Sequence, residues 1–161
     1  MDRDPDAALE QLRASRASVD AARQGTRDLA LRFRSVPLPD ELANAVDLLR
    51  AASISAEATV DVDAELAPAD VLGPVIRETT TNVLRHGGGS WARLSLTRDG
   101  AVWRYQISND APDGGETDAE GSGLDGLARR AGDAGGELEV YRDKGSFLVS
   151  ISVPAESTVR R

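Results

Sequence analysis

The residues best suited to chemistry are four polar side chains in one short segment: Glu78, Asn82, Arg85 and His86. On a helix, positions i, i+4, i+7 and i+8 fall on one stripe, so these side chains would face the same way. The amide oxygen of Asn82 is a hard ligand of the type that Mg²⁺ prefers. Glu78 could order a metal-bound water or accept a proton, whereas Arg85 and His86 could contact a phosphate. The alternatives are structural: a hydrogen bond near a helix end for Asn82, a solvated carboxylate for Glu78 and a packing role for His86.

A helix across residues 71–89 is expected to position this polar stripe. An apolar stripe runs beside the polar one, so the helix can pack on a core and still present polar groups. The members of the apolar stripe are Leu72, Val75, Ile76, Thr79 and Val83. Pro68 suits the first turn of the helix, and Pro74 lies early enough in it to be tolerated. The glycines at 87–89 then end the helix and allow close approach of the backbone.

A second glycine pattern lies later in the chain, where Gly121 and Gly123 precede Leu124 at the start of a predicted helix, 122–134. Glycines at such a position let backbone N–H groups approach a phosphate. The N-terminus of a helix also favours anions, by about 0.3–1 kcal/mol per charge. The pattern therefore predicts an anion-binding helix N-terminus here.

The composition of the chain excludes several classes of site. Its 161 residues are 40% hydrophobic, which suits one domain with its own core and a helical appendage. It has no cysteine and one histidine, so disulfides, thiolate ligands and a multi-histidine metal site are excluded. A net charge of −8 argues against nucleic acid as the main partner, although backbone dipoles and a metal ion could still hold a nucleotide. No run approaches the roughly 20 apolar residues of a membrane span, and the acidic N-terminus lacks a signal-peptide pattern.

The other elements are expected to alternate between helices and hairpin strands. Asp40 is expected to cap a short helix, 41–52. The predicted strands are 59–62, 91–97, 102–108, 138–142 and 147–153, with a polar, glycine-rich loop at 109–121. Strands paired as hairpins, with helices inserted between them, indicate an α+β fold in the form of a two-layer α/β sandwich.

A long helix is expected at residues 6–36, where two sets of positions repeat every seven residues. The first set is Leu12, Val19, Thr26 and Phe33, and the second is Ser15, Ala22, Leu29 and Val36. Two interpretations remain open. The segment could be a single amphipathic helix lying on the domain, or one helix of a dimeric helical bundle.

Two of these motifs carry a resemblance to a known family. The stretch RETTTNVLRHG, 77–87, resembles the N box of the histidine-kinase branch of the GHKL ATPases. GSGLDGLARRAGDAGGELEV, 121–140, resembles their second glycine box with the helix and strand that follow. The resemblance covers residues 29–154, and the most similar variant is the short-lid type of kinase paired with NarL-like response regulators. It implies an ATP site with Mg²⁺, in which Asn82 binds the metal that bridges the phosphates.

The resemblance also implies roles for the neighbouring residues. Glu78 matches the first, catalytic residue of the N box, and Arg85 and His86 would lie at the phosphates. Gly121, Gly123 and Leu124 would line the phosphate side from the second helix. His86 lies inside the nucleotide site, so it is not expected to be the phosphoacceptor.

The adenine end departs from the family pattern. A D-x-G motif is expected after the strand 102–108, but Asn109 and Ala111 occupy the aligned positions. Either Asp110 takes the role with the loop shifted by one residue, or Asn109 contacts adenine through its amide oxygen. A neutral acceptor would bind nucleotide more weakly than a carboxylate, because charge-assisted hydrogen bonds are about twice as strong.

The resemblance implies three regions in the chain. Residues 1–36 resemble the second helix of a dimerisation and phosphoacceptor hairpin, 37–154 the ATP-binding catalytic domain, and 155–161 a tail. The implied activity is that of a two-component sensor histidine kinase that transfers the γ-phosphate of Mg-ATP to a histidine. No histidine precedes His86, so that acceptor is not present in this sequence.

The implied partners are a NarL-like response regulator and, in the full-length kinase, a second copy of the chain. The implied location is cytoplasmic, either for the protein alone or as the cytoplasmic part of a membrane-anchored sensor. Two other functions remain open. One is a stand-alone anti-sigma-type serine/threonine kinase of the GHKL class, and the other is a non-catalytic nucleotide-sensing or dimerisation module.

Overall fold

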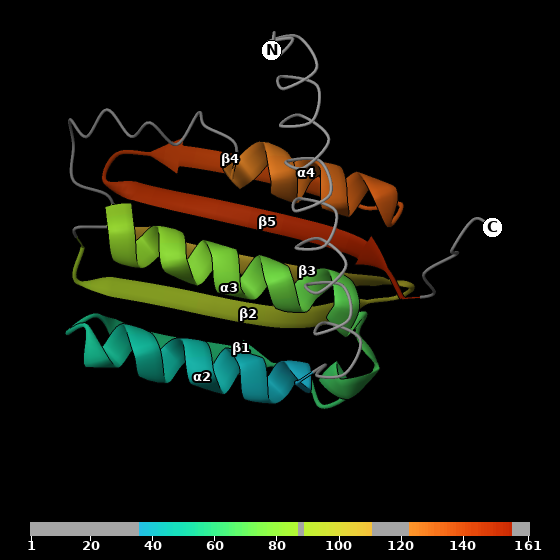
Figure 1. Cartoon of the computed structure of the whole chain (residues 1–161), viewed down its shortest axis with the longest axis horizontal. Helices are drawn as coiled ribbons and strands as arrows, with labels where there is room; N and C mark the ends of the chain where they lie inside the picture. The colour runs from blue at the N-terminus through green and yellow to red at the C-terminus, as the bar shows by residue number, and fades with distance from the viewer. Residues whose placement is uncertain (1–35, 87–88, 111–122, 156–161) are drawn as a thin grey trace, which may run out of the picture. The chain divides into compact units, whose positions relative to one another are not determined.

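The computed structural model describes residues 36–86, 89–110 and 123–155. The chain divides into two compact units, Met1–Ser35 and Val36–Arg161, and every described residue belongs to the second. The helix predicted at 6–36 therefore lies outside the described residues, except for Val36, and so do 111–121 of the predicted loop and 156–161 of the tail. Along the chain (Figure 1) the elements are α2 (Leu38–Ala51), β1 (Ser55–Val60), η1 (Ala64–Leu66), α3 (Ala69–His86), β2 (Trp91–Asp99), β3 (Val102–Asp110), α4 (Gly123–Asp133), β4 (Glu137–Asp143) and β5 (Ser146–Pro154).

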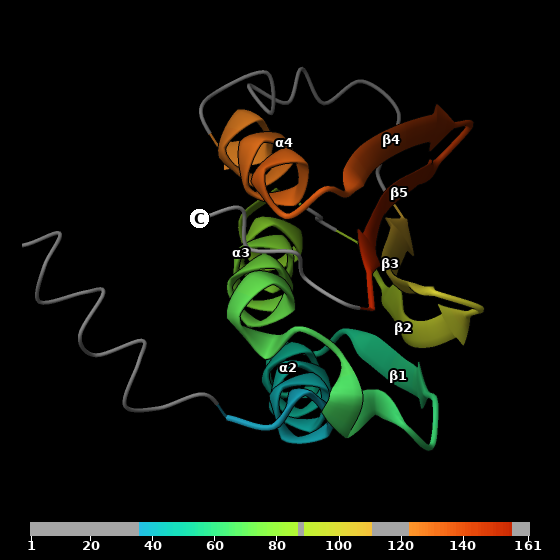
Figure 2. The same cartoon turned by 90° about the vertical axis from the view of Figure 1, so that its right-hand side faces the viewer.

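The strands form one five-stranded sheet in the order β1-β2-β3-β5-β4. β1 pairs with β2 in parallel, and the three other pairs are antiparallel. The helices α2, α3 and α4 all lie on one side of this sheet (Figure 2). The predicted α+β fold, a two-layer α/β sandwich, is therefore confirmed.

The core lies between the helices and the inner face of the sheet. Alternate residues of β3 point inward, and Trp103, Tyr105 and Ile107 are all almost fully buried there. The helix α3 contributes the apolar stripe expected from the sequence, since Leu72, Val75, Ile76, Thr79 and Val83 are all buried. Because one helix face is fixed against the sheet, the neighbouring stripe of polar residues has a defined direction.

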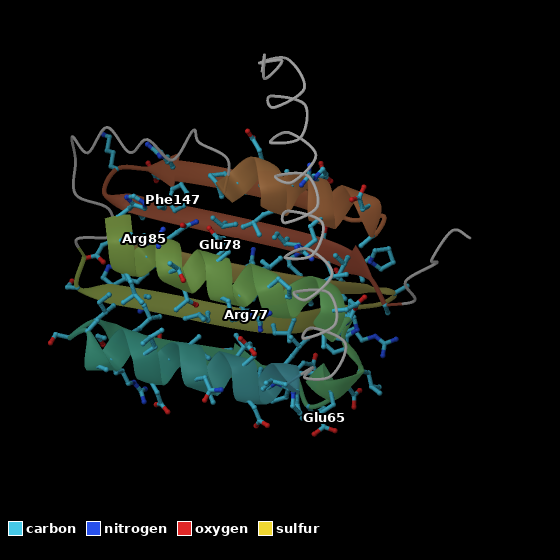
Figure 3. The ribbon with its side chains drawn as sticks, in the orientation of Figure 1. Glu65, Arg77, Glu78, Arg85 and Phe147 are labelled. Carbon is cyan, nitrogen blue, oxygen red and sulfur yellow. The ribbon has the colours of Figure 1, made fainter. Side chains whose placement is uncertain are left out.

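An ion pair joins α3 to α2. Arg77 Nη1 donates to Glu41 Oε1 at 3.0 Å, and Glu41 is only 8% exposed. This contact lies on the α2 side of α3, whereas Glu78 lies on the α4 side (Figure 3).

The predicted start of α2 is wrong. The helix begins at Leu38 after Pro37 at the N-cap, and no side chain makes a capping hydrogen bond. Leu38 is 1% exposed, and its burial favours a helix that begins earlier than helix propensity alone would predict. Asp40 lies in the first turn with Glu41, where a carboxylate interacts favourably with the helix dipole without capping the helix.

The predicted first strand is also misplaced. β1 covers Ser55–Val60 and not 59–62, because it pairs with β2 from Ser55↔Trp91 to Val60↔Leu96. Its first residues are serine, alanine and glutamate, which have low strand propensity, so the partner strand decides the boundary.

The hairpin β2–β3 is longer than expected. Gly100, with φ of 59°, forms the predicted turn, but β3 continues to Asp110. Asn109 and Asp110 therefore belong to the end of a strand and not to the loop predicted at 109–121. Both are held in register against Phe147 and Ser146 of β5.

Within the part of the chain that the structure describes, no helix is long and apolar enough to cross a lipid bilayer.

Candidate functional site

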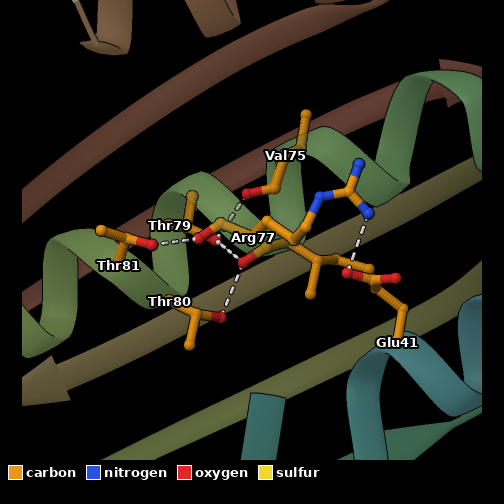
Figure 4. A network of polar contacts seen from close by, with 7 residues as sticks. Glu41, Val75, Arg77, Thr79, Thr80 and Thr81 are labelled. Atoms are coloured by element: carbon orange, nitrogen blue, oxygen red, sulfur yellow. Dashed lines mark hydrogen bonds and ion pairs between the residues drawn. The ribbon is translucent and has the colours of Figure 1, made fainter. Parts of the chain in front are cut away.

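The candidate site is built on α3, whose residues fold as a helix in spite of a run of three threonines. Pro68 lies just before the helix, and its carbonyl oxygen accepts from the backbone N–H of Leu72 at 2.9 Å. The hydroxyls of the threonines bond back to the helix one turn earlier: Thr79 to Val75 O at 2.9 Å, Thr80 to Ile76 O at 2.6 Å and Thr81 to Arg77 O at 2.8 Å (Figure 4). These bonds satisfy the hydroxyls of Thr79 and Thr80 inside the core, whereas Thr81 is only half-buried.

The four polar residues predicted on α3 occupy the expected positions. Glu78 and Asn82 are half-buried, and Arg85 and His86 are exposed in the last turn. The two half-buried residues can therefore be held in place by their surroundings while remaining partly accessible.

The N-terminus of α4 lies next to Glu78. A Cβ atom added at Gly123 would lie 3.3 Å from Glu78 Oε1, so the glycine allows a close approach between the two helices. Leu124 follows Gly123 and packs against the core as a partly buried residue. Gly121 lies outside the described residues. The structure thus brings together Glu78 and Gly123, two residues 45 positions apart that belong to separate sequence motifs.

Asp110 has a structural role that the sequence did not indicate. Its carboxylate accepts hydrogen bonds from Ser90 N at 2.6 Å, Ser90 Oγ at 2.9 Å and Trp91 N at 3.0 Å. A side chain at Gly89 would collide with this carboxylate, so the glycine is needed for the contact. Asp110 therefore anchors the start of β2, directly after the glycine run that follows α3.

Asn109 lies on the inner face of the sheet, at the end of β3. It is 4% exposed, and its Nδ2 donates to the backbone oxygen of Asp110 at 2.9 Å. Among the described residues, no hydrogen bond to its Oδ1 is found. Within the described residues the amide oxygen of Asn109 therefore has no donor, whereas the carboxylate of Asp110 already accepts from Ser90 and Trp91.

Phe147 of β5, which the sequence did not single out, pairs with Asn109. Phe147 is half-buried, and the guanidinium carbon of Arg142 lies 5.3 Å from the centre of its ring. Figure 3 labels Phe147 together with Glu78 and Arg85. The register of the hairpin β4–β5 could have indicated this residue, because an aromatic residue next to its turn lies at the same end of the strands as Asn109.

The described residues contain no cluster of three or more His, Cys, Asp or Glu side chains that could hold a metal ion. A metal held by protein side chains alone is therefore not supported in this part of the chain. One amide oxygen from Asn82 fits a different arrangement, in which Mg²⁺ keeps several waters and is held mainly by phosphates. The donor set is thus suited to Mg²⁺ that arrives with a nucleotide.

Asp110 gives the domain a pH dependence that can be measured. Partial burial opposes ionisation, but the hydrogen bonds from Ser90 and Trp91 outweigh it and lower the pKa of the carboxyl below its ordinary value. Because the folded pKa is the lower one, this stabilisation is present above the unfolded pKa and is lost as pH falls through the folded pKa. We expect Asp110→Asn to lower the free energy of unfolding at pH 7 by about 1 kcal/mol. The variant should also lose less stability than the wild type below about pH 4.

Urea unfolding from pH 7 to pH 3 would measure this effect. Asp47→Asn, which makes the same change at an exposed position of α2, is the matched control. Identical profiles for Asp110→Asn and the wild type would contradict the anchoring role of Asp110.

Comparison with known proteins identifies the fold of the chain. No family model matches the chain. The sensor histidine kinase DesK of Bacillus subtilis (strain 168) is 24% identical in an alignment 163 residues long, which covers 96% of this chain and 43% of DesK. The histidine kinase domain of the Erythrobacter litoralis EL346 blue-light activated histidine kinase matches with a TM-score of 0.58 at 23% identity, over 74% of this chain and 62% of that one. The catalytic domain of the histidine kinase ThkA matches with a TM-score of 0.59 at 15% identity, over 78% of this chain and 97% of that one.

The fold is that of a histidine kinase catalytic domain. Its curated sequence relatives are sensor histidine kinases, and the chain spans less than half of their length, 43% for DesK and 41% for a second Bacillus subtilis kinase, YvfT.

Proposed function

We propose that the chain is the Mg-ATP-binding catalytic domain of a two-component sensor histidine kinase. The observation that carries the proposal is the proximity of Gly123 to Glu78. It brings the N-terminus of α4, a position that favours anions, next to Glu78, one turn before the metal-ligand candidate Asn82. The sensor histidine kinases among the relatives support the same function.

In this proposal the residues of the chain bind and orient the nucleotide. Asn82 offers its amide oxygen to the metal, and Glu78 orders a water or accepts a proton beside it. Arg85 and His86 extend from the last turn of α3 toward the phosphates, and Gly121, Gly123 and Leu124 present the backbone of the α4 N-terminus. When bound, Mg²⁺ supplies positive charge that offsets the charge of the phosphates. Positioning and charge stabilisation of this kind account for most of the catalysis of phosphoryl transfer.

The base of the nucleotide is assigned to the end of β3. Asn109 has an amide oxygen without a hydrogen bond from the described residues, whereas Asp110 already accepts from Ser90 and Trp91. We therefore assign the contact with adenine to Asn109, with Asp110 holding the adjoining backbone.

The phosphoacceptor is assigned to another polypeptide segment. The single histidine of the 161 residues is His86, which lies on α3 within the candidate site. We propose that the acceptor histidine comes from outside this sequence. The kinase would be a cytoplasmic homodimer of the short-lid type, and its response regulator would be of the NarL-like type.

A phosphotransfer assay with γ-labelled ATP and Mg²⁺ tests this function, using candidate dimerisation hairpins that carry a histidine and candidate regulators as acceptors. Label that is lost in acid but kept in alkali would indicate phosphohistidine and support the proposal. Acid-stable label on serine or threonine would favour the anti-sigma-type kinase instead.

A second function is favoured by one observation, the neutral Asn109 at the position where a carboxylate would bind adenine more strongly. Under it the chain is a non-catalytic nucleotide-sensing or dimerisation module. An intact fold that binds Mg-ATP without phosphotransfer would favour a nucleotide-sensing module over both kinases, and an intact fold with neither would favour a dimerisation module.

Removal of residues 1–36 tests the proposed division of the chain into a dimerisation helix and a catalytic domain. The unit Val36–Arg161 has its own core, so the truncated chain is expected to fold and to keep its affinity for Mg-ATP. Self-association is expected to disappear, because the heptad positions of residues 6–36 are lost. Sedimentation equilibrium measures this directly, and a truncated chain that still dimerises would contradict the role given to residues 1–36.

A further inference from the structure

A buried hydrogen bond joins the candidate-site helix to the centre of the sheet. The hydroxyl oxygens of Tyr105 and Thr79 lie 2.9 Å apart. Tyr105 is fully buried and Thr79 is 2% exposed. Among the residues that the structure describes, this is the one hydrogen bond between side chains of α3 and of the sheet.

The direction of this bond follows from the other contacts of Thr79. Its hydroxyl has one proton, which it donates to the backbone oxygen of Val75 at 2.9 Å. A lone pair of Thr79 Oγ1 is then left to accept from the Tyr105 hydroxyl. Burial raises the pKa of Tyr105 far above its ordinary value, so the hydroxyl stays protonated and remains a donor.

The position of Thr79 on α3 determines where the polar stripe points. Successive residues of an α-helix are turned by about 100°. Glu78 therefore lies about 100° to one side of Thr79, and Asn82, three residues on, lies about 60° to the same side. Fixing Thr79 against Tyr105 thus fixes both polar residues in one direction, toward the flank where Gly123 approaches Glu78.

We propose that the Tyr105–Thr79 hydrogen bond is a positioning device, which sets the rotation of α3 on the sheet and so aims Glu78 and Asn82 at the N-terminus of α4. The inference rests on the proposed function for its effect on nucleotide affinity. The apolar contacts of α3 hold it on the sheet, but burial of apolar surface is not directional. A buried hydrogen bond is directional and costly to leave unmade, so it can select one rotation among several that bury similar area.

The chain contains a matched control in the next residue. Thr80 is 2% exposed, as Thr79 is, and its hydroxyl donates to Ile76 O at 2.6 Å. Thr80 lies about 100° to the other side of Thr79, on the flank away from Glu78 and Asn82. Replacing either threonine by valine removes one buried hydroxyl, but only Thr79→Val removes a bond to the sheet.

The test compares Tyr105→Phe, Thr79→Val, Thr79→Ser, Thr80→Val and the double variant Tyr105→Phe/Thr79→Val in the whole chain. Tyr105→Phe is the mildest probe, because Thr79 keeps its bond to Val75 O. Two quantities are measured. Residual dipolar couplings of the α3 amides without nucleotide report the orientation of the helix. Calorimetry reports the Kd for Mg²⁺ with a non-hydrolysable ATP analogue.

The proposal predicts that Tyr105→Phe and Thr79→Val change the couplings of α3 and weaken binding by about fivefold, because the competent orientation is less populated. Thr80→Val should stay within about twofold of the wild type, and Thr79→Ser, which keeps the hydroxyl, should retain wild-type affinity. The affinity of the double variant should equal that of the single variant with the lower affinity, since both changes remove the same hydrogen bond.

Unchanged couplings in both Tyr105→Phe and Thr79→Val, with affinities equal to that of Thr80→Val, would overturn the positioning role. If the wild type itself does not bind the analogue, the proposed function fails. In that case the residual dipolar couplings alone test the positioning role. A reorientation of α3 in Tyr105→Phe but not in Thr80→Val would support that role.

Discussion

Replacement of Asn82 by alanine is expected to weaken the binding of Mg-ATP by more than about 100-fold while the fold stays intact. Loss of a residue that merely supports a metal ligand typically costs 10- to about 100-fold in affinity, and Asn82 is proposed as the ligand itself. Asn82 is half-buried on the flank of α3, and no described residue forms a hydrogen bond with its side chain. Its removal therefore takes a ligand from the metal and little from the core.

Calorimetric titration of Mg-ATP into the variant measures this loss, and circular dichroism checks the fold. Thr81→Ala is the matched control, because Thr81 is the adjacent half-buried residue and, among the described residues, its hydroxyl bonds only to Arg77 O, at 2.8 Å. Thr81→Ala should bind as the wild type does. Loss of cooperative unfolding in Asn82→Ala would instead identify Asn82 as a structural residue.

Replacement of Gly136 by alanine is expected to destabilise the domain by about 2–3 kcal/mol. A Cβ at this position would collide with the backbone oxygen of Ser152 and would lie 2.8 Å from Val153 Cγ1. Because Ser152 is held within β5 by pairing on both sides, its carbonyl cannot move without disturbing the sheet. The connection between α4 and β4, where Gly136 N donates to Ala131 O at 2.8 Å, must shift instead.

Thermal unfolding of Gly136→Ala should show a Tm lower by roughly 8–12 °C for a domain of this size. Gly132→Ala is the control, since no described residue beyond its own helix backbone and chain neighbours lies within 4 Å of its added Cβ, and alanine suits a helix better than glycine. Gly132→Ala should unfold at or slightly above the wild-type temperature. Equal Tm values for the two variants would contradict the close approach at Gly136.

Much of the fold could be predicted from local patterns. The apolar stripe of α3 repeats at helical spacing, and the hairpins β2–β3 and β4–β5 have alternating strands around glycine turns. These signals are local, because a helix face or a strand face is set by residues a few positions apart. The starts of α2 and β1 could not be placed this way, since burial of Leu38 and pairing with β2 decide them.

The candidate site was only partly predictable for the same reason. The polar stripe of α3 and the glycine pattern before α4 were found from spacing, but their proximity depends on the packing of two helices. Asp110 looked like a loop residue, although its carboxylate anchors Ser90 and Trp91, some 20 positions earlier. Thr79 fitted the apolar stripe, and its partner Tyr105 lies in another element, 26 positions away. Such tertiary contacts leave no periodic signal in the sequence.

Binding of Mg-ATP to this fold can be measured by the thermal stability of the whole chain with and without Mg-ATP. A ligand present at 100 times its Kd stabilises the folded state by about 2.7 kcal/mol. We therefore expect a rise in Tm of several degrees that requires Mg²⁺ and is absent in Asn82→Ala. A cooperative transition whose Tm is the same with and without saturating Mg-ATP would contradict the proposed binding.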